Sequence, residues 1–141
     1  MRLDITRVDR SLPLPSYGTP GSAGFDFYAR EEVTIPAGTL GYIPSNSIIG
    51  VPRGHVLMVA LRSSTPGKKG LLSPHGVGII DQDYCGPEDE IKIEVYNFTD
   101  GPCTVHRGER IAQGLLLPVV KCEWEEREAS ATSRGGFGST D

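Results

Sequence analysis

Apolar residues in this chain are gathered in short runs, and glycine and proline are scattered between them along the whole chain. The run at 91–98 alternates with a period of two, so Ile91, Ile93, Val95 and Asn97 share one face of a strand. The other face, Lys92, Glu94, Tyr96 and Phe98, mixes charge with aromatic rings and is expected to meet solvent or another subunit. Further apolar runs lie at 33–35, 40–44, 55–61 and 111–120.

No window of a dozen residues keeps a period of 3.6, so we expect little helix. A short helical turn near 108–113 is an alternative, but the apolar run after it favours a strand. Short strands separated by frequent turn residues are typical of an all-β sandwich or barrel. With 141 residues, of which 38% are hydrophobic, the chain is expected to form one domain. We expect a β domain over 1–128 and a mobile arm over 129–141, because the end of the chain is small and polar.

The net charge of −4 and the absence of a basic run argue against binding to a nucleic-acid polymer, whereas a nucleotide monomer needs only a few cations. Three cysteines without a Cys-x-x-Cys pair are expected to be reduced thiols. The N-terminus has no apolar signal core, and no run approaches the ~20 apolar residues that span a bilayer. We therefore expect a soluble, cytoplasmic protein that does not bind membranes.

Asp81 is the first candidate for chemistry, because it directly follows the apolar residues of Gly78–Ile80. A buried or half-buried carboxylate at the end of an apolar segment suggests a general base. Tyr84 adds a ring that could stack on a sugar. The alternative is that Asp81, Gln82 and Asp83 form a polar turn.

A second group of residues suggests phosphate binding. Arg62, Ser63 and Ser64 end an apolar run and offer the donors that anions need, or they form a solvated strand end. Asp26 lies within an apolar segment, so it either supports a magnesium–phosphate site or is a satisfied structural carboxylate. Gln113 could point at ligand, although the charged turn before it could equally be a surface Arg/Glu pair.

The glycine-rich end of the chain, residues 134–140, could clasp phosphate with its backbone and hydroxyl groups. Its Arg134 adds a charge and Phe137 a ring for a base, and the alternative is a disordered end. The three histidines lack metal-ligand spacing, so a zinc site is not expected. These segments together suggest cleavage of a small molecule that carries phosphate.

Five segments occur in an order that resembles the trimeric, all-β deoxyuridine triphosphatase (dUTPase) family. They span almost the whole chain and comprise Ala23–Ala29, Arg62–Ser64, Gly78–Tyr84, Arg107–Gln113 and Gly135–Thr140. The resemblance implies a jelly-roll-like fold and a homotrimer with three interfacial sites, each drawing on three chains. It also implies hydrolysis of dUTP to dUMP and pyrophosphate with Mg²⁺, which keeps uracil out of DNA and supplies dUMP for thymidylate synthesis.

The resemblance also assigns roles to residues. Asp81 would be the base for the attacking water, and Tyr84 would pack on the deoxyribose. The substrate-binding set would comprise Arg62, Ser63, Ser64 and Gln113 at the phosphates, and His75, Gly78, Ile79, Ile80 and Lys92 around uracil. Asp26 would contact the metal through water. The arm would place Phe137 over uracil and Arg134, Gly138, Ser139 and Thr140 near the outer phosphates.

Two alternatives remain at this stage. The related dCTP deaminases share the Arg-Ser-Ser segment and carry a catalytic glutamate in a strand that resembles 93–97, so Glu94 could be a deaminating base. Against this, the second arginine expected soon after Arg-Ser-Ser is replaced here by 65–69. A non-catalytic nucleotide-binding regulator is the other alternative, although the intact Asp81 argues against it. The loop 85–90 departs from the family pattern because it is longer and acidic.

Overall fold

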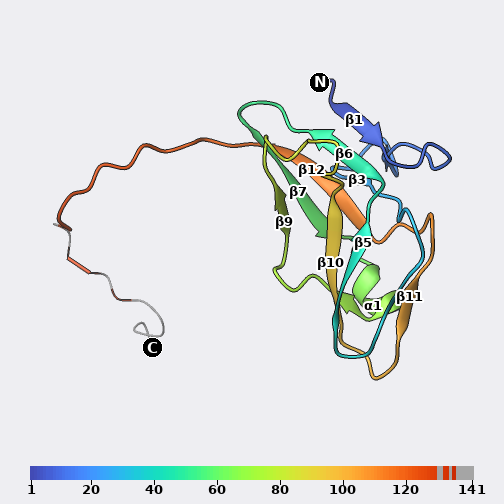
Figure 1. The fold of residues 1–141 in the computed structure, drawn as a ribbon. Coiled ribbons are helices and arrows are strands. Elements are labelled where there is room, and N and C mark those ends of the chain that lie inside the picture. The colour runs from blue at the N-terminus through green and yellow to red at the C-terminus, as the bar shows by residue number, and fades with distance from the viewer. Residues whose placement is uncertain (130–131, 134, 136–141) are drawn as a thin grey trace.

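The computed structural model describes residues 1–129, 132–133 and 135. These residues form short strands and one helix (Figure 1). In chain order the elements are β1 (Asp4–Arg7), β2 (Ser16–Tyr17), β3 (Phe25–Asp26), β4 (Val33–Ile35), β5 (Leu40–Pro44), β6 (Ser47–Gly50), β7 (His55–Leu61), α1 (Thr65–Lys69), β8 (Leu71–Leu72), β9 (Gly78–Ile80), β10 (Lys92–Asn97), β11 (Cys103–Val105) and β12 (Ala112–Pro118).

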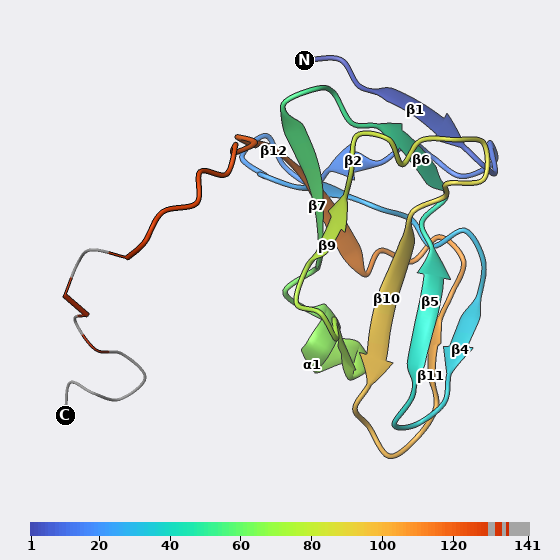
Figure 2. The same ribbon diagram turned by 60° about the vertical axis from the view of Figure 1, so that its left-hand side comes forward.

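The largest sheet has five strands in the order β2-β3-β12-β7-β9, and a second sheet has the order β5-β10-β8. Two further pairs, β1-β6 and β11-β4, complete the set, and every pairing is antiparallel. Figure 2 shows β9, the edge strand of the five-stranded sheet, running beside β10, the central strand of the second sheet. The all-β, jelly-roll-like fold with little helix is therefore confirmed.

The hydrophobic runs correspond closely to strands. The runs at 40–44 and 55–61 are β5 and β7, and most of 111–120 is β12. In β10 the predicted alternation is confirmed, since Ile93, Val95 and Asn97 are buried while the residues between them are not. Alternate burial identifies β10 as a strand with one face on the core.

The alternative of a helical turn near 108–113 does not occur, and the favoured strand begins at Ala112. Arg107 and Gly108 form a turn there, with Gly108 at a positive φ of 80° and its N–H donating to the carbonyl of Ala29. The helix is instead α1, which has Pro66 in its first turn and ends at Gly70 in the left-handed conformation. Proline at the start and glycine just past the end are ordinary helix boundaries.

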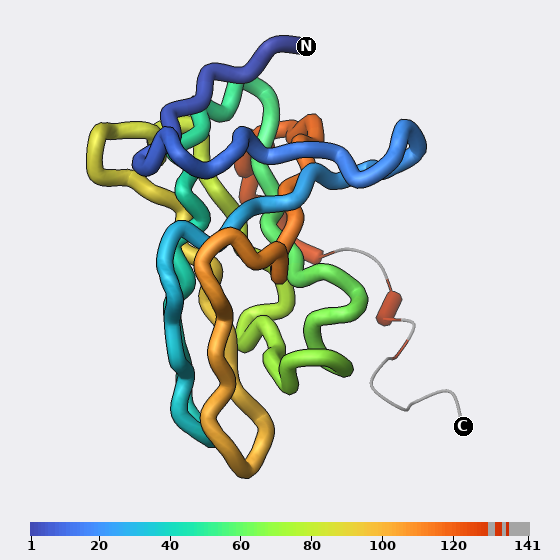
Figure 3. The backbone as a smooth tube through the Cα atoms, turned by 90° about the vertical axis from the view of Figure 1, so that its right-hand side faces the viewer, coloured from blue at the N-terminus to red at the C-terminus, as the bar shows by residue number. Residues whose placement is uncertain are grey.

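Apolar side chains from both large sheets meet in one core. Phe27, Ile43, Leu57 and Val95 are each at most 1% exposed. The rings of Phe25 and Phe27 pack edge to face with centroids 5.4 Å apart. Figure 3 shows the N-terminal segment crossing one end of this body, with the loop that joins β10 to β11 at the other.

A buried ion pair holds the acidic loop that follows Tyr84. Glu90, 8% exposed, accepts hydrogen bonds from the guanidinium of Arg30 at 2.9 and 3.0 Å and from the backbone N–H of Asn46 at 2.8 Å. The hydrogen bond with Glu90 raises the pKa of Arg30. Asp89 accepts from the N–H of Gly86 at 2.7 Å. Two of the acidic residues in the loop are therefore used to hold its shape.

After β12 the described chain runs away from the body without a helix or strand (Figure 1). Val120 is 91% exposed and Trp124 is 95% exposed on this segment. The predicted arm from 129 lies almost wholly outside the described residues, so the division at 128 stays a prediction. Among the described residues, no helix has the length and apolar character needed to cross a bilayer. All three cysteines are free thiols.

Replacing Glu90 by alanine should lower the free energy of unfolding by about 2–3 kcal/mol, because Arg30 and the N–H of Asn46 both lose a buried acceptor. Denaturant unfolding at one fixed protein concentration measures this. Glu31→Ala is the matched control, since Glu31 lies 3.5 Å from the same arginine but is exposed, and it should cost less than about 1 kcal/mol. Equal losses in the two variants would contradict the role given to Glu90.

Candidate active site

Asp26 lies at the centre of a cluster of polar residues on the five-stranded sheet. It is 6% exposed in β3, where it stands opposite Gln113 of β12. Its two carboxylate oxygens lie 3.2 Å from Arg62 Nε and 3.2 Å from Arg110 Nη1. A buried carboxylate is tolerated when both oxygens are paired. Asp26 therefore orients two guanidinium groups.

The backbone brings these two arginines together. Arg62 directly follows β7, and its N–H donates to the carbonyl of Ile111 at 2.8 Å. The hydroxyl of Thr65 donates to the same carbonyl at 2.7 Å, which ties the start of α1 to the residue after Arg110. Arg62 Nη1 also donates to the carbonyl of Arg110 at 3.3 Å. Both arginines are thus set by main-chain contacts as well as by Asp26.

The surrounding hollow, here called the phosphate hollow, is lined by Gly18, Thr19, Ser22, Gly24, Asp26, Arg62, Ser63, Arg110 and Gln113. Its two arginines and one aspartate leave one net positive charge, and the hydroxyl and amide groups add neutral donors. Such a set suits the oxygens of an anion. Ser64 lines the adjoining hollow with Lys68. The predicted phosphate residues Arg62, Ser63 and Gln113 therefore lie together, with Ser64 beside them.

Gly24 allows Gln113 to lie close against the backbone. A Cβ atom added at Gly24 would lie 2.7 Å from Gln113 Oε1 and 3.2 Å from its Cδ. Such distances are shorter than van der Waals contact, so a larger residue would displace the amide. The glycine thus fixes where the amide group of Gln113 sits in the phosphate hollow.

A second hollow, here called the base hollow, lies between β9 and β10. Its lining includes His75, Gly78, Ile80, Lys92 and Glu94. Among the described strands, β9 pairs only with β7, and residues 92–95 of β10 pair only with β5. Two strand edges therefore face each other without a ladder between them. Their free N–H and C=O groups can read the edge of a planar polar ring.

A third hollow contains Asp81, together with His55, Val56, Ile79, Gln82, Asp83, Val119 and Lys121. The expectation that Asp81 is buried or half-buried was wrong for the single chain, because Asp81 is exposed. It follows the edge strand β9, and Gln82 and Asp83 after it form the polar turn. Gln82 Nε2 donates to the carbonyl of His55 at 3.1 Å, which anchors that turn to the start of β7.

Tyr84 lies just beyond the turn and is 38% exposed. Its hydroxyl donates to the carbonyl of Glu90 at 3.3 Å, and its N–H donates to the carbonyl of Asp81 at 3.4 Å. The ring is therefore positioned by the same loop that Arg30 holds in place. Tyr84 and Asp81 remain close in the fold, as their spacing in the sequence suggests.

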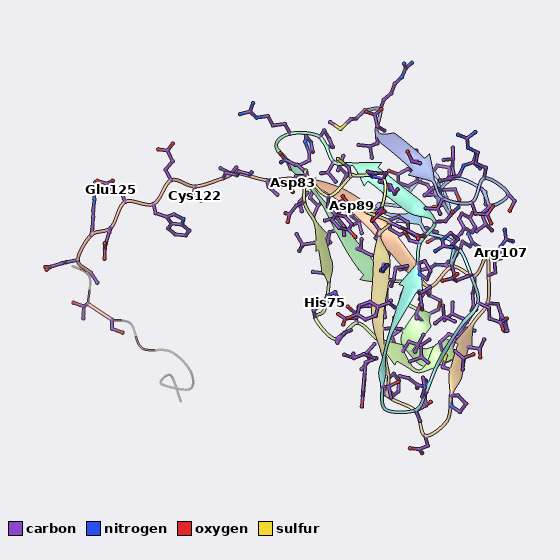
Figure 4. The ribbon with its side chains drawn as sticks, viewed as in Figure 1. His75, Asp83, Asp89, Arg107, Cys122 and Glu125 are labelled. Atoms are coloured by element: carbon purple, nitrogen blue, oxygen red, sulfur yellow. The ribbon has the colours of Figure 1, made fainter. Side chains whose placement is uncertain are left out.

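Strand β7 separates Asp81 from the phosphate hollow. Ile80 pairs with Leu57 near the start of β7, whereas Arg62 follows its last residue. At about 3.3 Å per residue, the six steps from Val56 to Arg62 span roughly 20 Å. Figure 1 shows β7 running from the end where the tail leaves the body toward α1. In Figure 4, Asp83 lies at that first end and His75 at the opposite end of β9.

Sequence reasoning missed Arg110, which was placed in a possible surface Arg/Glu pair. The arginines of that turn instead pair outside it, Arg107 with Asp9 at 2.6 Å and Arg110 with Asp26. Glu109 pairs with Lys69 at 2.8 Å. The signal that could have identified Arg110 is its position three residues before Gln113, which lies in β12, the strand that pairs with β3.

The predicted site residues of the arm, Arg134, Phe137, Gly138, Ser139 and Thr140, lie outside the described residues.

In the described part of the chain, no cluster of three histidine, cysteine or acidic residues could hold a metal ion. Because both oxygens of Asp26 contact guanidinium groups, its remaining contacts to a metal would run through water. The described residues therefore fit a metal that arrives with phosphate better than a resident ion.

Comparison with known proteins places this geometry in a family. The dUTPase family model matches residues 10–141. The deoxyuridine 5'-triphosphate nucleotidohydrolase of Dictyoglomus turgidum is 38% identical over 147 aligned positions, covering 99% of this chain and 98% of the relative.

Solved structures of dUTPases have the same fold as this chain. The dUTPase of Streptococcus mutans superposes with a TM-score of 0.79 at 32% identity, covering 86% of this chain and 98% of that protein. The Staphylococcus bacteriophage 80alpha dUTPase with dUpNHpp reaches a TM-score of 0.86 at 22% identity, covering 99% and 98%, and so shows the shared fold. The comparisons lend no support to the deaminase or the regulator, and the chain belongs to the dUTPase family.

Proposed function

We propose that this protein hydrolyses dUTP to dUMP and pyrophosphate, at sites completed where copies of the chain meet. The observation that carries the proposal is the position of Asp81 and Arg62 at opposite ends of β7. The side chain of Arg62 and one water molecule cannot together span the roughly 20 Å along the strand that separate Arg62 from Asp81. One nucleotide can use both groups only if they come from different copies. A homotrimer with three such sites, each drawing on three chains, meets this requirement.

Asp81 is the group that starts the reaction. Its exposed carboxylate accepts a proton from a water molecule that attacks the α-phosphorus. The bond from the α-phosphorus to the bridging oxygen breaks on the opposite side, and pyrophosphate leaves. The proton of the water remains on Asp81 until solvent takes it. This role needs only that the water lies within hydrogen-bond distance of Asp81 and close to the α-phosphorus.

The phosphate hollow of a neighbouring copy binds the triphosphate. Arg62, Ser63 and Gln113 donate to phosphate oxygens, Ser64 does so from the adjoining hollow, and Asp26 keeps Arg62 in place. Because Asp26 offsets one of the two arginines, the hollow supplies only one net positive charge. A triphosphate carries more negative charge than that. Magnesium bound to the nucleotide would offset part of the remaining charge and would enter with the substrate, with Asp26 in reach of it through water.

The base hollow receives uracil. The unpaired edges of β9 and β10 present backbone groups from Gly78 and Ile80 to the polar edge of the base, with His75 and Lys92 at the rim. Ile79 points to the hollow of Asp81, so its contribution is its backbone. Tyr84 packs against the deoxyribose. Backbone recognition of this kind suits a small base whose donors and acceptors are all at one edge.

The arm completes the site in this proposal. Phe137 covers uracil, and Arg134, Gly138, Ser139 and Thr140 contact the outer phosphates, so that closure excludes water when substrate is present. The three free thiols are those of a reducing compartment, and we place the reaction in the cytoplasm.

Asp81→Asn should lower kcat by at least about 100-fold, since the amide cannot accept the proton of the attacking water. The dissociation constant for a non-hydrolysable dUTP analogue should change less than threefold, roughly, because Asp81 does not hold the phosphates. Pyrophosphate release and calorimetric titration measure the two quantities. Asp83→Asn, on the same exposed turn, is the matched control and should keep its activity. Activity of Asp81→Asn within a few-fold of the native protein would refute the base assignment.

Gly24→Ala should lower kcat/KM for dUTP by about 10- to 100-fold, because the new methyl group displaces the amide of Gln113 from the phosphate hollow. The melting temperature should change little, since the displaced atoms end a flexible side chain. Gly21→Ala is the control, because a Cβ there meets nothing within 4 Å. If both variants kept native kinetics, the position that Gly24 allows Gln113 to take would not contribute to kcat/KM.

A further inference from the structure

Two residues that line the base hollow, His75 and Glu94, form a polar cluster with Tyr42, and the mechanism above uses neither Glu94 nor Tyr42. Tyr42 of β5 stands directly opposite Glu94 of β10, and its hydroxyl donates to Glu94 Oε1 at 2.8 Å. On the other side, His75 Nε2 lies 3.4 Å from Glu94 Oε2. Each oxygen of the carboxylate therefore has its own partner.

His75 is itself held in place. Its Nδ1 lies 2.8 Å from the carbonyl oxygen of Val77, which can only accept a hydrogen bond. A singly protonated ring can donate at one of its two nitrogens, whereas a doubly protonated ring can donate to both Val77 and Glu94. The hydrogen bond to Glu94 raises the pKa of Tyr42, as expected for a phenol that donates to a carboxylate.

Glu94 lies where its contacts can affect which base binds in the base hollow. Glu94 lines the base hollow together with His75, Gly78 and Ile80, and its side chain is 21% exposed. A carboxylate with a free oxygen attracts an amino group, which cytosine carries at the position where uracil carries a carbonyl oxygen. A free Glu94 would thus favour the wrong base, because sites that hydrogen-bond a polar group discriminate strongly.

We propose that the contacts of Tyr42 and His75 hold the Glu94 carboxylate in place and weaken it as an acceptor for the amino group of cytosine. The cluster is then a specificity-determining device that rejects cytosine nucleotides. Tyr42 acts through Glu94 and is a positioning residue. The proposal rests on the proposed function, since it assumes that a pyrimidine base enters the hollow between β9 and β10.

Tyr42→Phe tests this directly, because it removes one donor from Glu94 and keeps the ring. The ratio of kcat/KM for dCTP to that for dUTP should rise about tenfold, while kcat/KM for dUTP changes less than threefold, roughly. Pyrophosphate release reports turnover of both nucleotides, and chromatography identifies the monophosphate formed. Tyr96→Phe is the matched control, since Tyr96 lies two residues from Glu94 on the same strand and should leave the ratio unchanged.

A double variant connects the effect to the carboxylate. In Tyr42→Phe with Glu94→Gln, the ratio should return to within about threefold of the native value, because the free acceptor charge is gone. An unchanged ratio in Tyr42→Phe, with dUTP turnover retained, would overturn the proposal. So would a selective loss of dUTP affinity in Glu94→Gln alone, since the carboxylate would then read the N3–H of uracil directly. Formation of dUMP from dCTP would overturn it by making Glu94 a deaminating base.

These results are separable from a failure of the proposed function. If the native protein released no pyrophosphate from dUTP with magnesium, the assignment of the reaction itself would fail. If the native protein hydrolysed dUTP and Tyr42→Phe kept the native ratio, only the role of the cluster would fail.

Discussion

The length of one strand limits how this protein can work. Strand β7 carries the turn of Asp81 beside its first residues and Arg62 just after its last one. Because a strand cannot shorten, roughly 20 Å always separate these groups within one chain. In the proposed mechanism, a nucleotide held by both groups lies between copies, and an association of subunits is part of the site itself.

Within each chain, the polar groups are held rigidly although the hollows are open. Asp26 orients Arg62 and Arg110, and the Glu90–Arg30 pair holds the loop that positions Tyr84. The base hollow exists because β9 and β10 belong to two different sheets and do not pair with each other. The same arrangement leaves Glu94 at the rim, where its neighbours decide what it can accept. Positioning residues that never touch the reacting atoms thus shape both binding and specificity.

Local patterns in the sequence predicted much of the fold. The alternation at 91–98 and the apolar run 55–61 correspond to β10 and β7, because a half-buried strand leaves a period of two and a buried one leaves a continuous run. The helix α1 was missed, since five residues are too few for a helical period. Arg110 was missed because its partner Asp26 lies 84 residues away, and only the pairing of β3 with β12 brings them together. The exposure of Asp81 was missed because the apolar run before it does not distinguish an edge strand such as β9 from a central one.

Complementation between two inactive variants is the most direct test of a site shared between copies. Asp81→Asn and Arg62→Gln, each carrying a different affinity tag, would be co-expressed, and assemblies containing both would be assayed for pyrophosphate release from dUTP. If Asp81 and Arg62 of one site come from different chains, each mixed trimer has one intact site of three and should show about a third of the native activity per chain. Each variant alone should be inactive. Mixed assemblies as inactive as their parents would contradict the account, because they would place both groups in a site within one chain.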